Sequence, residues 1–164
     1  MTTTDSRTPP RRLGPAWLGI DLPAGRAQPA WWRWLVAALI AGVLSVAACG
    51  ILAAAGTAAD PAAAGYEHFR FPDYAKLTIA GVIAAVIVWP IITLLSSRAG
   101  RLYVGISALA LVASFAPDLW ILHGGQPPIA VAFLGLMHVA VAAITVAAIL
   151  VVAPQRRRRD PAVA

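Results

Sequence analysis

Two ionisable residues, Asp118 and His138, lie within stretches of the sequence that are otherwise apolar. Ionisable side chains in membrane spans are costly, and they usually face the interior of a helix bundle, where they pair or carry protons and ions. Counting along the apolar stretches places Ser45, Ser114 and His138 at similar depths, and it places Asp118 about one turn from the outer surface. We group these four residues as a candidate intramembrane polar site.

Two interpretations of this candidate site stay open. In the first, His138 forms a hydrogen bond with the hydroxyl of Ser45 or Ser114, which satisfies a neutral imidazole and fixes the register of the helices. In the second, Asp118 and His138 relay protons or ions inward from the outer face. A relay needs polar groups on both sides of His138, and few lie on its inner side, namely Thr93, Ser107 and Thr145. The first interpretation is therefore favoured.

Other charged residues gather near the outer ends of the apolar stretches. Asp73 opens the second stretch, and we expect its carboxylate to cap the N-terminus of a helix. We expect Asp118 to pair with Lys76 or His123. Carboxylates and a histidine could also bind a divalent metal, but their spacing matches no ligand pattern, so we predict no metal site.

Sequence motifs of enzymes are missing from the chain. There is no Gly-x-Ser-x-Gly, His-Glu-x-x-His, phosphate loop or dinucleotide fingerprint. We therefore expect no catalytic residue, no cofactor and no enzyme activity. The single cysteine, Cys49, follows Val46-Ala47-Ala48, which resembles a lipoprotein signal with Cys49 as the lipidation site. A long leader and the apolar residues 51–55 argue against cleavage there.

Four long apolar stretches must position these residues. The chain has 164 residues, of which 60% are hydrophobic and 12% charged, whereas soluble domains carry about 25% charged residues. About 20 apolar residues in a helix cross the hydrocarbon core of a bilayer, so we predict spans at about 34–55, 76–96, 102–122 and 129–152. The third span contains Pro117-Asp118 and is expected to continue through it. The predicted fold class is an all-α membrane protein with an antiparallel four-helix transmembrane bundle.

The distribution of arginine predicts how this bundle is oriented. Lys and Arg are enriched at the cytoplasmic ends of membrane helices, and Trp at membrane–water interfaces. We predict that both termini are cytoplasmic, with these topology determinants: Arg98, Arg101, Arg156, Arg157, Arg158 and Arg159. The predicted interfacial anchors are Trp31, Trp32 and Trp34. A disordered tail (1–30) and a basic tail (154–164) then flank the membrane domain (31–153). The net charge of +6 is assigned to topology and anionic headgroups, and no nucleic-acid partner is expected.

The first span carries a row of small residues spaced four apart: Ala37, Ala41, Ser45 and Cys49. Such rows allow membrane helices to approach each other closely. Besides the lipid bilayer, a homo-oligomer or a membrane-protein partner is therefore expected. We predict a non-enzymatic structural or accessory membrane component, and the alternative is a small transporter or a proton- or ion-conducting subunit that uses His138 and Asp118.

Two segments carry a resemblance to a known family: Ser114-Phe115-Ala116-Pro117-Asp118, and residues 134–143 with Met137-His138 at their centre. Together with the arginine-rich ends, they resemble an uncharacterised actinobacterial family of four-span integral membrane proteins (domain of unknown function 6069). The resemblance covers residues 34–153 and implies a multi-pass protein of the bacterial plasma membrane. Because the family has no assigned activity, the resemblance implies no functional residue.

Overall fold

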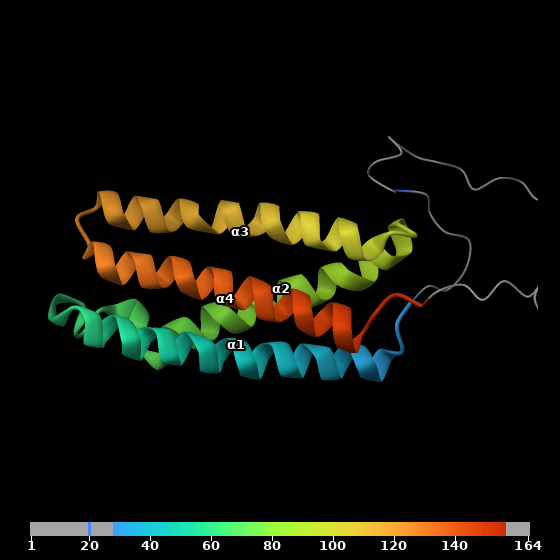
Figure 1. The fold of residues 1–164 in the computed structure, drawn as a ribbon, viewed down its shortest axis with the longest axis horizontal. Coiled ribbons are helices and arrows are strands. Elements are labelled where there is room, and N and C mark those ends of the chain that lie inside the picture. The colour runs from blue at the N-terminus through green and yellow to red at the C-terminus, as the bar shows by residue number, and fades with distance from the viewer. Residues whose placement is uncertain (1–19, 21–27, 157–164) are drawn as a thin grey trace, which may run out of the picture.

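A computed structural model describes residue 20 and residues 28–156 of the chain, which form four long helices (Figure 1). These are α1 (Trp31–Ala59), α2 (Phe71–Leu95), α3 (Ala99–His123) and α4 (Pro128–Val152). Two short 3-10 turns, η1 (Pro61–Ala63) and η2 (Glu67–Phe69), lie between α1 and α2. Successive helices run in opposite directions, so the predicted all-α antiparallel four-helix bundle is confirmed.

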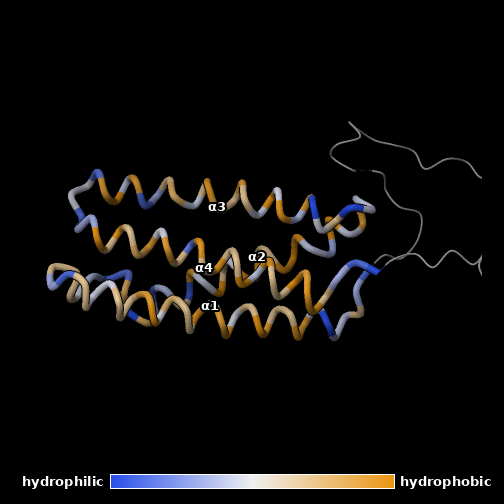
Figure 2. Tube along the Cα trace, in the orientation of Figure 1, coloured by the Kyte–Doolittle hydropathy of each residue, from blue (hydrophilic) through white to orange (hydrophobic). Residues whose placement is uncertain are grey.

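All four helices are long and apolar enough to cross a membrane. A helix of 25 residues extends over about 37 Å, which exceeds the hydrocarbon thickness of about 30 Å. Figure 2 shows apolar residues along the whole length of each helix, with polar residues gathered at the two ends of the bundle. A helix satisfies its own backbone hydrogen bonds, so a helix with an apolar surface is stable in lipid. The chain is thus a multi-pass membrane protein.

The helices begin and end outside several of the predicted boundaries. The loop left between the first two predicted spans, 56–75, is shorter in the structure, because α1 continues to Ala59 and α2 begins at Phe71. Pro72 fits the first turn of α2, where its missing N–H is not needed. The N-cap of α2 is Arg70, so the expected capping role of Asp73 is wrong. Asp73 lies within the first turn, where it accepts a hydrogen bond from Lys76 Nζ at 2.6 Å.

Helix α4 lies at the centre of the arrangement, between α1 and α3 in Figure 1. It packs most extensively against α1 and next against α3, while α2 packs mainly against α1. Helix α3 is the most open of the four, and its buried residues are Ala99, Tyr103 and Asp118. We call the end with Arg33 and the α2–α3 turn the arginine end, and the opposite end, with η1 and η2, the loop end.

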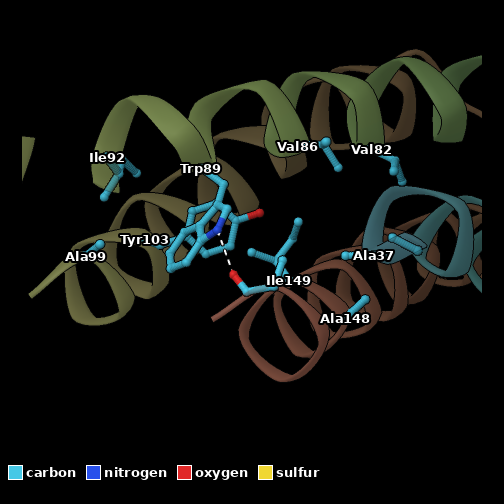
Figure 3. Close-up of a cluster of buried hydrophobic side chains, with 11 residues drawn as sticks. Ala37, Val82, Val86, Trp89, Ile92, Ala99, Tyr103, Ala148 and Ile149 are labelled. Carbon is cyan, nitrogen blue, oxygen red and sulfur yellow. Dashed lines mark hydrogen bonds between the residues drawn. The ribbon is translucent and has the colours of Figure 1, made fainter. Parts of the chain in front are cut away.

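A cluster of buried side chains fills the bundle near the arginine end (Figure 3). Trp89 and Tyr103 are each 1% exposed and Ile149 is fully buried. The two aromatic rings meet edge to face with their centroids 5.1 Å apart. Ala37 and Ala148 line the same cluster, and their small side chains let α1 and α4 approach closely. This half of the bundle is therefore densely packed.

Side chains satisfy backbone carbonyls that the helices leave free. Pro90 has no N–H, so the carbonyl of Val86 lacks its intrahelical donor, and the indole of Trp34 donates to it at 2.9 Å. At the end of α4, Arg33 Nε donates to Val152 O at 2.6 Å and Trp89 Nε1 donates to Ala153 O at 2.9 Å. Unpaired carbonyls are costly where water is scarce. These bonds therefore tie α1 and α2 to each other and to the end of α4.

Candidate intramembrane polar site

Asp118 and His138 meet between α3 and α4. Asp118 Oδ2 lies 3.2 Å from His138 Nε2, and Oδ1 lies within hydrogen-bonding geometry of the same nitrogen at 3.4 Å. Asp118 is only 6% exposed, whereas 37% of the His138 side chain is accessible. The structure thus joins two of the four residues of the candidate site into an acid–histidine pair.

The direction of the side chains explains how residues at different depths come into contact. Asp118 lies five residues before the end of α3, and His138 lies ten residues after the start of α4, so their Cα atoms differ in depth by about 7 Å. Helical side chains lean toward the N-terminus of their own helix. Because α3 and α4 are antiparallel, Asp118 and His138 lean toward each other. This lean brings the two side chains into contact across the difference in depth.

The expected bond between His138 and a serine hydroxyl is wrong. Ser114 Oγ donates instead to Leu111 O of its own helix at 2.7 Å, a common local bond for a serine within a helix. Ser45 Oγ is buried and has no hydrogen-bond partner among the described residues. Neither the Ser114–Leu111 bond nor the unpartnered Ser45 hydroxyl could be predicted from depth along the sequence. Depth alone does not include the direction of a side chain or the hydrogen bonds within a helix.

The partners expected for Asp118 are also wrong. Lys76 pairs with Asp73 one turn away on α2, a spacing at which helical side chains are neighbours. His123 ends α3 with an exposed side chain. Among residues 28–156, no three residues of the His, Cys, Asp or Glu types come together in a way that could hold a metal ion. The described residues therefore offer no set of ligands for the divalent metal considered in the sequence analysis.

The loop between α1 and α2 brings Tyr66 into the neighbourhood of Asp118. The Tyr66 hydroxyl is buried and has no hydrogen-bond partner among the described residues. Burial raises the pKa of the Tyr66 phenol above its usual value, and the negative charges of Asp118 and Glu67 raise it further. The Phe115 ring meets the His138 ring edge to face, with centroids 6.1 Å apart. Sequence reasoning missed both aromatic residues, since only the fold brings them to the pair.

Gly56 allows this loop to pack closely on the bundle. A Cβ atom on Gly56 would lie 2.8 Å from two ring carbons of Phe69 and 3.1 Å from the ring of Phe133. The Phe69 ring, in turn, meets the Tyr66 ring edge to face at 5.3 Å. A glycine in α1 thus makes room for Phe69 of η2, and Phe69 in turn contacts Tyr66.

No continuous row of polar side chains leads from His138 to the arginine end among the described residues. The hydroxyl of Thr145 is buried without a partner, and that of Thr93 is bonded to Pro90 O of its own helix at 2.8 Å. Trp89, Tyr103 and Ile149 are packed together between the levels of Thr145 and Thr93. The acid–histidine pair is therefore separated from the arginine end by an apolar layer of Trp89, Tyr103 and Ile149.

The row of small residues on α1 faces the interior of the bundle. Ala37, Ala41 and Ser45 are fully buried, and Cys49 is 1% exposed. Cys49 Sγ lies 3.4 Å from Thr78 Oγ1 of α2. The row is therefore used within one chain, where it brings α1 against its neighbours, and it is not available to a second chain.

The aromatic and basic residues assigned to the interface lie at the arginine end. Trp31 and Trp32 are 73% and 54% exposed, whereas Trp34 binds Val86 as described above. Arg98 and Arg101 are exposed at the α2–α3 turn, and Arg156 is exposed after α4. The remaining predicted topology determinants, Arg157, Arg158 and Arg159, lie outside the described residues, as do most of the two predicted tails.

The helices and their arrangement define the class of protein, a multi-pass membrane protein with a four-helix bundle. No family model, curated protein or solved structure matches the chain. The resemblance to the actinobacterial four-span family therefore stays a prediction.

Proposed function

We propose that the protein is a non-enzymatic structural or accessory component of the bacterial plasma membrane, which associates with a second copy of itself. The observation that carries this proposal is an apolar groove of about 840 Å³ between α1 and α2. It extends along α1 from Trp34 to Ala47 and along α2 from Phe71 to Ile87. Thirteen residues of helix correspond to about 20 Å, so the groove can accommodate several turns of another transmembrane helix.

The shape of the groove suits a helix. Its wall on α1 includes residues spaced four apart, namely Ala38, Gly42 and Val46. Each of them directly follows a residue of the buried small-residue row on the same helix. Exposed side chains also line the groove, including Leu39 (67%) and Ile83 (53%). Lipid is as apolar as these side chains, so association in a membrane depends on close packing rather than on hydrophobicity. A groove with small residues in its wall offers such packing.

Cysteine cross-linking in membranes tests this proposal. In a Cys49→Ser background, Val43→Cys places a thiol on a groove residue that is 59% exposed, and Leu109→Cys places one on α3 at 71% exposure. We expect disulfide-linked dimers for the first variant and few for the second, because a disulfide requires Cα atoms within about 7 Å. Equal cross-linking at both positions, or a strictly monomeric protein in mild detergent, would contradict the proposal.

The second candidate is a small transporter or a proton- or ion-conducting subunit. The contact between Asp118 and His138 at 3.2 Å favours it, because such pairs occur in proton relays. The apolar layer of Trp89, Tyr103 and Ile149 argues against it. Proton flux into liposomes separates the two candidates. We expect wild-type protein to add nothing to the leak of empty liposomes. A flux that His138→Leu abolishes and His123→Leu preserves would establish the conducting function instead.

The proposed orientation places both termini in the cytoplasm. Arg33, Arg98, Arg101 and Arg156 all belong to the arginine end, and Arg-rich ends of membrane helices stay on the cytoplasmic side. Accessibility of a single engineered cysteine to a membrane-impermeant reagent tests this proposal. At Gly65, in the loop, labelling of intact cells is expected; at Gly100 it is not.

A further inference from the structure

A second pocket lies at the arginine end, on the opposite side of the bundle from the acid–histidine pair. It has a volume of about 310 Å³ and is lined by Arg98, Gly100, Arg101 and Gln155. That volume is at the lower limit of small-molecule sites, which measure about 300–1,000 Å³. The pocket is formed where the α2–α3 turn meets the segment that follows α4.

Hydrogen bonds hold the wall of this pocket in place. Gln155 Nε2 donates to Ser96 O at 2.7 Å, and Gln155 Oε1 accepts from Ala99 N at 3.2 Å. Arg98 N donates to Ser96 Oγ at 3.0 Å. One glutamine side chain thus fastens the segment after α4 to the turn before α3. The positions of Arg98 and Arg101 are set by this framework.

The charge of the pocket is not compensated within the described part of the chain. Neither guanidinium forms an ion pair there, and the four acidic residues of residues 28–156 belong to the loop end or to the outer part of the helices: Asp60, Glu67, Asp73 and Asp118. The N-terminus of α3 adds a partial positive charge at the same place. An anion is therefore the ligand that this pocket fits.

We propose that the pocket binds the phosphate of an anionic phospholipid headgroup. Arginine presents a planar fork of donors that matches phosphate oxygens. Exposed Trp31 and Trp32 at the same end of the bundle place it at the headgroup level. An apolar surface for an acyl chain begins within about one turn of the pocket, with Val104 46% exposed on α3 and Val151 74% exposed on α4. A free phosphate would make no use of that surface.

Native mass spectrometry of the full chain in mild detergent tests the site, with phosphatidylglycerol and phosphatidylcholine as probes. We expect phosphatidylglycerol to bind more tightly, and its affinity to fall at least about tenfold in Arg98→Gln/Arg101→Gln. The control, Arg156→Gln/Arg158→Gln, removes the same charge from the C-terminal basic run and should lower affinity less than about threefold. Arg98→Lys/Arg101→Lys keeps the charge without the fork, and we expect intermediate affinity.

Three results would overturn the proposal. Equal losses in the two Gln pairs would mean that diffuse charge attracts the lipid. Wild-type affinity in the Lys pair would mean that the arginine fork is not used, and this variant decides the matter if the Gln pair fails to fold. Displacement of phosphatidylglycerol by millimolar inorganic phosphate would make the ligand a free anion. None of these results depends on whether the groove between α1 and α2 binds a second copy.

Discussion

Replacing His138 with leucine removes the side chain that contacts the buried carboxylate of Asp118. A buried polar group that loses its partner costs about 1–3 kcal/mol. Hydrogen bonds between membrane helices are worth only about 0.6 kcal/mol on average and at most about 1.7 kcal/mol, so we expect the lower part of that range, about 1–1.5 kcal/mol. The free energy of unfolding should fall by this amount in His138→Leu.

A double-mutant cycle isolates the contact from other effects of the substitution. Asp118→Ala removes the carboxylate, and the double variant removes both partners. We expect the double variant to be destabilised by about 1 kcal/mol less than the sum of the two single variants, within the range measured for hydrogen bonds between membrane helices. The assay is unfolding in mixed micelles of a mild detergent and dodecyl sulfate, followed by circular dichroism.

The control is the same substitution at a histidine that is exposed. His123 ends α3 and has an exposed side chain, so His123→Leu should change stability by less than about 0.5 kcal/mol. Strict additivity of Asp118→Ala and His138→Leu, within about 0.3 kcal/mol, would refute the reasoning. The pair would then be a proximity without an energetic coupling.

Two further substitutions test the packing at each end of the bundle. Gly56→Ala would force the Phe69 ring to move, since the new Cβ would lie 2.8 Å from it, and should cost about 1–3 kcal/mol. Gly81→Ala meets nothing within 4 Å and should cost nothing, so an equal loss in both variants would contradict the role of Gly56. Trp89→Phe keeps the ring but loses the bond to Ala153 O; thermal unfolding should show a loss of about 1–3 kcal/mol, and an unchanged midpoint would contradict that role.

The number of helices could be predicted from the sequence because a bilayer imposes length and apolarity on each span. The helix ends were less predictable. The sequence predicts that the first span ends before Gly56, whereas α1 continues to Ala59. The glycine is needed within the helix because Phe69 approaches it closely. That requirement arises from a contact between distant segments and leaves no local signal.

The small-residue row shows a different limit of sequence reasoning. A spacing of four places Ala37, Ala41, Ser45 and Cys49 on one face of α1, and this follows from helical geometry. Periodicity does not say whether that face meets the same chain or another. In the structure the row is buried within the bundle, and the neighbouring face, with Ala38 and Gly42, lines the exposed groove.

Four membrane-spanning helices, and the two ionisable residues within them, can be predicted from the sequence, because both follow from the order of apolar and polar residues along the chain. The packing of the helices determines that Asp118 meets His138 and that an apolar layer of Trp89, Tyr103 and Ile149 separates this pair from the arginine end. Each helix can turn about its own axis at little change in local energy, and packing against the other three selects which side chains face one another.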